Sequence, residues 1–193
     1  MAVPKYYEMY KSFLKVLIDG KIHSMQEEKQ QVISDFNLSE EQTTELLPSG
    51  RQSIFDNRIG WCRTYLKKAG LIESPSRGQH RITASGIKVY NENEVVNDYV
   101  LRQFPAFLKF KGEDNHKDKE VIESKSDEET PQETLDRVFK ELNLSLANEL
   151  LAEICKMDPY RFETLVVELL IKMGYGRLQY GSQATKKSGD EGI

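Results

Sequence analysis

A long polar stretch in the second half of the chain is the feature that most limits how this sequence can fold. Residues 112–133 consist largely of charged and small polar side chains, with clusters at 112–120 and 123–131. Such a stretch buries too little apolar surface to offset the conformational entropy that ordering costs. We therefore expect a helical extension and a charged linker over 93–133, with one domain before them and another over 134–193.

Four helices are predicted in the first part of the chain. Apolar residues recur at three- and four-residue spacing over 5–18 and 53–69, which is typical of helices that bury one face. Between them, Ser24 and Ser39 are each followed three residues later by Glu or Gln, the capping-box pattern that starts a helix. Gly70 is expected to end the fourth helix.

Two short strand-like runs follow this fourth helix. Residues 71–73 and 80–83 flank a turn-forming segment of Ser, Pro, Arg and Gly. A further helix is expected from Ala84, with the preceding threonine as its cap. This order of helices, a basic helix, a hairpin and a last helix predicts a winged helix, an elaborated helix-turn-helix, over 1–92.

After the linker, the helical spacing of apolar residues returns. Residues 135–142 predict one helix and residues 146–154 predict a second. Asp158 followed by Pro159 is a strong signal for the start of a third helix. The apolar stripe of that helix, over 162–173, is expected to be buried. The predicted fold class is therefore mainly α.

The charge balance changes along the chain. The whole chain has a net charge of −4, which by itself argues against a nucleic-acid partner. Residues 51–88, however, contain eight Lys or Arg against two Asp or Glu, whereas residues 1–50 contain five Lys against eight acidic residues. A local positive field on one module is the usual mark of contact with DNA phosphates.

Two segments carry a family pattern. In the first segment, residues 57–71 show N-R-x-x-W-x-x-x-x-L-K-x-A-G-L, and residues 77–86 of the same segment show R-G-x-x-x-x-T-x-x-G. The second segment comprises 162–176 and the Ser-Gly-Asp-Glu-Gly-Ile run at 188–193. In this order, and separated by a charged linker, the two segments resemble the Mrr-type, modification-dependent restriction endonucleases.

The resemblance implies a fold and an activity. It implies a winged-helix DNA-binding domain, followed by the helical start of an α/β restriction-endonuclease-like domain of the PD-(D/E)xK class, which cleaves methylated DNA with Mg²⁺. The family's aspartate and its Q-A-K strand would follow Ile193. We therefore expect a truncated nuclease domain, no complete metal site and no DNA cleavage by this chain. Glu163 is the single residue that matches an acidic family position near the metal.

Basic residues of the first domain are the candidates for DNA contact. They lie off the apolar face of 53–69 or at the tip of the hairpin, where winged helices meet the major groove and the adjacent backbone. A solvated basic face is the competing interpretation. Trp61 is expected in the core, and His80 in a strand of the hairpin. With their polar neighbours, the predicted DNA-binding residues are Arg51, Asn57, Arg58, Arg63, Lys67, Lys68, Arg77, Gln79 and Arg81.

Several classes of protein find no support in the sequence. It contains no phosphate-binding Gly loop, no CxxC pair and no HExxH helix. No apolar run is long enough for a membrane helix, and the N-terminus has no secretory signal. Cys62 and Cys155 are expected to be reduced thiols of a cytoplasmic protein.

The predicted partner is double-stranded DNA, with methylation as a candidate feature, and a homodimer through 134–173 is an open alternative. The function that follows is modified-DNA binding in a restriction system. The alternative is a stand-alone winged-helix DNA-binding or regulatory protein without nuclease activity.

Overall fold

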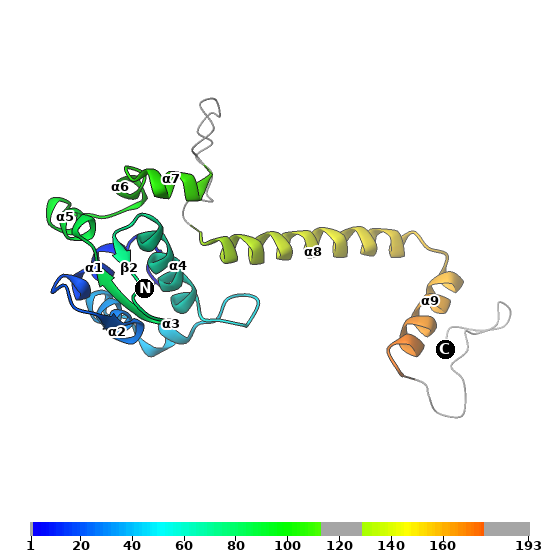
Figure 1. Ribbon diagram of the computed structural model, residues 1–193. Coiled ribbons are helices and arrows are strands. Elements are labelled where there is room, and N and C mark those ends of the chain that lie inside the picture. Colours follow the sequence, from blue (N-terminus) through cyan, green and yellow to red (C-terminus); the bar gives the residue numbers. More distant parts are fainter. Residues whose placement is uncertain (1, 113–128, 176–193) are drawn as a thin grey trace. The chain divides into compact units, whose positions relative to one another are not determined.

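The computed structural model describes residues 2–112 and 129–175, and these fall into two units (Figure 1). The first unit ends at Val138 and the second begins at Phe139, so the long helix α8, Pro131–Cys155, contributes to both. The last residues of the predicted linker are therefore helical. Its middle part, 113–128, lies outside the described residues.

Helices of the first unit begin where the local capping signals predict. The Ser24 hydroxyl accepts a hydrogen bond from the Glu27 amide, and the Glu27 carboxylate accepts one from the Ser24 amide, which confirms the capping box of α2. Ser39 and Gln42 form the same arrangement at α3, which confirms the second. The described helices before α8 are α1 (Tyr10–Leu17), α2 (Met25–Phe36), α3 (Glu40–Thr44), α4 (Ile54–Lys68), α5 (Ala84–Glu92), α6 (Asp98–Leu101) and α7 (Pro105–Lys111).

A small antiparallel sheet accompanies these helices. The predicted hairpin is confirmed as β2 (Ile72–Glu73) and β3 (Gln79–Ile82), with Ile72 opposite Ile82. A third strand, β1 (His23–Ser24), was not predicted, because its two residues directly precede α2 and carry only the capping signal. It pairs with β3 and gives the order β1-β3-β2. The predicted mainly-α class is confirmed, while the winged helix stays a prediction.

The core of the first unit lies between α1, α4 and the elements that cover them. Trp61 packs at its edge, with its ring 5.5 Å from that of Tyr65, which confirms the expected core role. Phe107 on α7 is fully buried, and its ring lies 5.6 Å from Tyr65. The first unit therefore includes α6 and α7, beyond the predicted domain end at residue 92. Central buried side chains are Tyr10, Phe13, Leu14, Leu17, Ile59, Cys62, Leu66, Leu71 and Leu101.

One glycine allows α5 to pack against the hairpin. A Cβ atom at Gly86 would lie 2.1 Å from the Leu71 carbonyl oxygen and 2.7 Å from Cγ1 of Ile82. Thr83 caps α5 by accepting from the Gly86 amide at 3.1 Å, and its hydroxyl donates to the Gly70 carbonyl. This contact joins the start of α5 to the turn that ends α4.

The second unit contains the rest of α8 and the helix α9, Pro159–Lys172. Asp158 caps α9, as predicted, by accepting from the Tyr160 amide. The expectation of two helices over 135–154 is wrong: residues 143–145 contain no helix breaker, and α8 is continuous.

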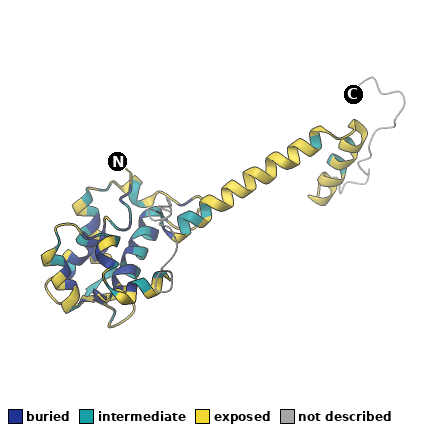
Figure 2. Cartoon of the chain, turned by 90° about the horizontal axis from the view of Figure 1, so that it is seen from above, coloured by how far each residue is buried: buried dark blue, intermediate teal, exposed yellow. Residues whose placement is uncertain are grey.

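The expectation of a buried stripe on α9 is also wrong, because nothing in the described residues covers it. Phe162 is 45% exposed and Leu169 is 55% exposed. Figure 2 shows that α8 and α9 are both exposed along most of their length. No described helix is long and apolar enough to cross a membrane.

Candidate nucleic-acid interface

Helix α4 presents two different faces. Ser53 caps it by accepting from the Asp56 amide at 3.1 Å. Ile59, Cys62 and Leu66 are fully buried on the inner face. Since residues four apart are neighbours on a helix, Arg63 lies next to Lys67 and Thr64 next to Lys68 on the opposite side. The C-terminal half of α4 therefore carries its cations outward.

A pocket of about 390 Å³ lies between this half of α4 and the turn between β2 and β3. Four cationic side chains line it: Arg63, Lys67, Lys68 and Arg77. The other described lining residues are Thr64, Ser74, Ser76, Gly78 and His80. No acidic residue is among them, so the pocket combines positive charge with hydroxyl groups that donate and accept hydrogen bonds. We call it the α4–hairpin pocket.

Most of the pocket's cations are available to a ligand. In the described parts of the chain, Arg63, Lys67 and Arg77 make no hydrogen bond and no ion pair. Lys68 makes a cation–π contact, with its Nζ 4.9 Å from the centroid of the Phe110 ring. Four of the nine predicted DNA-binding residues thus meet at one place.

Two predicted residues of the hairpin lie outside this pocket. The Arg81 guanidinium pairs with Glu73 across the β2–β3 ladder, with Nε 2.8 Å from Oε1. Gln79 accepts from the Ser76 hydroxyl at 2.6 Å and so helps to shape the turn. Both side chains have partners inside the hairpin.

The three remaining predicted residues lie at or before the N-terminal end of α4, where the start of α8 meets them. Arg58 pairs with Glu133, with Nη2 2.6 Å from Oε1, and these side chains are only 11% and 12% exposed. The Asn57 Oδ1 accepts from the hydroxyl of Thr130 at 2.6 Å. Arg51 lies close enough to contribute to the lowered pKa of Asp136. The structure therefore does not bring these residues to the α4–hairpin pocket.

A buried pair of side chains, His80 on β3 and Glu28 on α2, holds the hairpin on α2. His80 Nδ1 lies 2.8 Å from both carboxylate oxygens of Glu28, and both residues are buried. Burial raises the pKa of Glu28, although the hydrogen bond from His80 opposes this. The Met25 amide also donates to the Gly78 carbonyl at 3.0 Å. These contacts hold β3 and its turn on α2, and thereby hold Arg77 at the pocket.

Glu28 was not predicted as a site residue, although it follows the recognised capping residue Glu27. A buried glutamate in the first turn of a helix is indistinguishable in sequence from one that stabilises the helix N-terminus. The one signal in its sequence context is that it lies three residues after Met25 and four before Val32 and so shares their apolar face of α2, where a partner 52 residues away meets it.

The described residues do not fit a Mg²⁺ site. In residues 2–112 and 129–175, no three His, Cys, Asp or Glu side chains come together as ligands could. Glu163 is half-buried on α9. The predicted family run at 188–193 lies outside the described residues. Cys62 and Cys155 are both free, and burial raises the pKa of the Cys62 thiol.

Comparisons with known proteins match the two predicted segments in the predicted order. The Mrr N-terminal domain family matches residues 6–92, and a restriction endonuclease family of the Mrr type matches residues 154–193. The type IV methyl-directed restriction enzyme EcoKMrr of Escherichia coli strain K12 is 29% identical over all of this chain, which spans 66% of that enzyme's length. No solved structure matches. The resemblance to the Mrr-type restriction endonucleases is thereby confirmed, and every lining residue of the α4–hairpin pocket falls inside the first match.

Proposed function

We propose that this chain, a restriction-system protein of the Mrr type, binds double-stranded DNA through the α4–hairpin pocket. The observation that carries the proposal is the meeting of Arg63, Lys67, Lys68 and Arg77 around one opening, with no acidic residue among the lining residues that the structure describes. The family implies DNA as the partner, and the pocket supplies the chemistry for its phosphates. A winged helix would bring the same two elements, a helix and a hairpin, to the duplex.

Phosphate contact would dominate the affinity of such a site. Each phosphate that the protein neutralises releases counterions, so log K falls with log salt by roughly 0.9 for each contact on duplex DNA. Four cations therefore allow a slope of up to about −3.6. The hydroxyls of Thr64, Ser74 and Ser76 can donate further hydrogen bonds to phosphate oxygens.

Binding is tested by fluorescence anisotropy of a labelled duplex at several salt concentrations. The double variant K67A/R77A is expected to bind more weakly, with a slope less steep by about 1.8. Lys88→Ala is the matched control, because Lys88 is a cation of the same unit on α5 and does not line the pocket. Equal losses in the two variants, or none, would count against the pocket.

A preference for methylated DNA is the finer part of the proposal. The E. coli relative is named as methyl-directed. Because phosphate contacts carry no direct sequence information, a methyl preference requires base-edge contacts in addition to the pocket. Titrations with methylated and unmethylated duplexes of the same sequence decide this point.

The alternative function is a DNA-binding or regulatory protein without nuclease activity. It uses the same pocket and gives the same binding curves. The reading frame beyond Ile193 separates the two, because a continuation with the family's aspartate and Q-A-K strand favours the restriction protein, whereas a stop codon favours the alternative.

A further inference from the structure

The first turn of α8 carries its own capping box. The Thr130 hydroxyl accepts from the Glu133 amide at 3.2 Å, and Glu133 Oε2 accepts from the Thr130 amide at 2.9 Å. This reciprocal arrangement satisfies two amides that a helix start otherwise leaves unpaired. Thr130 and Glu133 therefore fix the point at which α8 begins.

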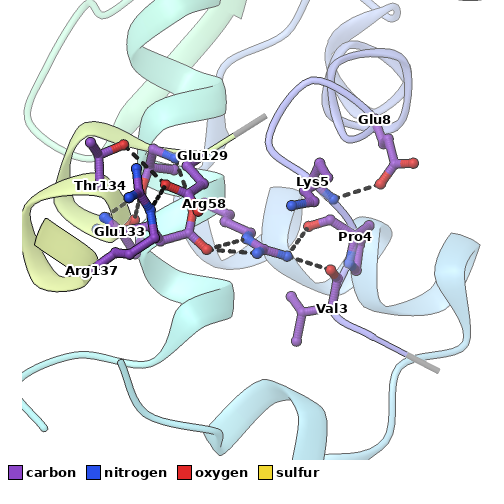
Figure 3. Close-up of polar contacts among 11 residues, drawn as sticks. Val3, Pro4, Lys5, Glu8, Arg58, Glu129, Glu133, Thr134 and Arg137 are labelled. Atoms are coloured by element: carbon purple, nitrogen blue, oxygen red, sulfur yellow. Dashed lines mark hydrogen bonds and ion pairs between the residues drawn. The ribbon is translucent and has the colours of Figure 1, made fainter. Parts of the chain in front are cut away.

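The same two side chains also hold α4. Arg58 donates from Nε and Nη2 to Glu133 Oε1 at 2.9 Å and 2.6 Å, while Thr130 donates to Asn57 Oδ1. The guanidinium further donates to the carbonyls of Val3 and Pro4 near the N-terminus. In Figure 3 the Arg58 side chain extends between Glu133 and these carbonyls. The start of α8 is thus anchored on the N-terminal half of α4.

All charged residues of this anchored segment, residues 129–136, are acidic, and we call the segment the α8 start. Burial alone would raise the pKa of Glu133, but hydrogen bonds from Arg58 and Thr130 outweigh it and lower that pKa. Asp136 accepts from the Ser49 amide at 3.3 Å, which lowers its pKa as well. Glu129 pairs with Arg137, Nε to Oε2 at 3.1 Å, at the edge of the cluster. Negative carboxylates are therefore held against Arg51 and Arg58.

The α8 start covers the same face of α4 on which the pocket opens. Asn57, Thr64 and Lys68 follow one another at spacings of seven and four residues, so they share one side of the helix. Thr64 and Lys68 line the pocket at the C-terminal half. Asn57, at the N-terminal half, is buried together with the fully buried Thr130. One half of this face is open and the other half is occupied.

We infer that the α8 start is an internal competitor of DNA for the N-terminal half of α4. The inference rests on the proposed function. Phosphate oxygens accept hydrogen bonds from a guanidinium as Oε1 of Glu133 does here, so phosphate and Glu133 compete for Arg58. DNA that follows α4 beyond the pocket displaces the α8 start and gains Arg58, and with it the nearby Arg51. The α8 start, which lies between the two family-matched regions, is released in the same step.

The test is the salt dependence of DNA binding by the full chain and by Glu133→Gln. Gln at this position keeps the capping box but removes the charge that holds Arg58. The variant is expected to bind duplex DNA about threefold to tenfold more tightly, with a salt slope steeper by roughly 0.9 for each phosphate gained. Glu149→Gln, the matched control, removes the same charge from an exposed site further along α8 and is expected to change neither quantity.

Hydrogen exchange of the unsubstituted chain gives an independent measurement. Backbone amides of residues 134–138 are expected to exchange faster when DNA is bound. Unchanged or slower exchange, or equal affinity and slope in Glu133→Gln and the unsubstituted chain, overturns the competition while leaving the proposed function intact. No DNA binding by any of the chains overturns the proposed function and the competition together.

Discussion

The close contact at Gly86 predicts that Gly86→Ala destabilises the protein, whereas helix propensity alone predicts that this substitution stabilises it. Alanine is favoured over glycine inside a helix by about 1 kcal/mol, so α5 considered alone would be stabilised by Gly86→Ala. The added Cβ, however, would lie 2.1 Å from the Leu71 carbonyl oxygen, and a backbone atom cannot rotate away. Overpacking of a tight site costs about 1–3 kcal/mol, and this contact belongs at the upper end. We therefore expect a net loss of about 2 kcal/mol in the free energy of unfolding.

Thermal unfolding followed by circular dichroism measures this effect. For a chain of this size, 1 kcal/mol corresponds to about 2–4 °C, so the Tm of Gly86→Ala is expected to fall by about 4–8 °C. Gly60→Ala is the matched control, because Gly60 is also helical and an added Cβ there meets nothing within 4 Å. Its Tm is expected to rise by about 2–4 °C. A Gly86→Ala chain as stable as the unsubstituted one would refute the packing argument.

Two buried or partly buried carboxylates give further predictions. Glu28→Ala removes one partner of the buried pair with His80 and is expected to lower the free energy of unfolding in urea by about 3–5 kcal/mol. A cost equal to that of Glu28→Gln, which loses the charge but keeps a hydrogen-bond acceptor, would show that the hydrogen bond with His80 contributes little beyond the charge. The pKa of Glu133 is lowered on folding, so its ionised form stabilises the fold above the ordinary value of 4.5, and this contribution is lost as the pH falls through the folded value. The stability difference between the unsubstituted chain and Glu133→Gln is therefore expected to be complete at neutral pH and to shrink in acid, and a difference independent of pH would contradict the ion pair with Arg58.

Local features of the fold could be predicted from the sequence because their causes are local. The capping boxes at Ser24 and Ser39 depend on residues three positions apart, and the hairpin depends on a turn-forming segment between two short apolar runs. The strand β1 could not be predicted in this way, because a two-residue strand has no periodicity of its own. Its existence follows from pairing with β3, more than fifty residues later.

In the candidate site, too, the features with local causes could be predicted, and those that depend on distant residues could not. Lys67 and Lys68 could be placed on the outer face of α4 by helical spacing alone, and Arg77 at the hairpin tip by turn chemistry. Their meeting in one pocket depends on the buried contact between Glu28 and His80, which are 52 residues apart. Sequence patterns within one element carry no information about such a pairing.

Arg58 shows why a basic residue on the expected helix was not enough to identify a DNA contact. In sequence it resembles Lys67: both lie on α4, off its apolar face, within the motif shared with the Mrr family. In the structure, Lys67 has no hydrogen bond or ion pair within the described residues, whereas Arg58 is nearly buried between Glu133 and two carbonyls. An arginine suits this second position because its planar fork of five donors satisfies a carboxylate and several carbonyls at once, which a lysine cannot do. Arg58→Lys is therefore expected to loosen the α8 start while keeping the positive charge, so a gain in DNA affinity from this variant would locate the competition in the geometry of Arg58 and not in the charge of α4.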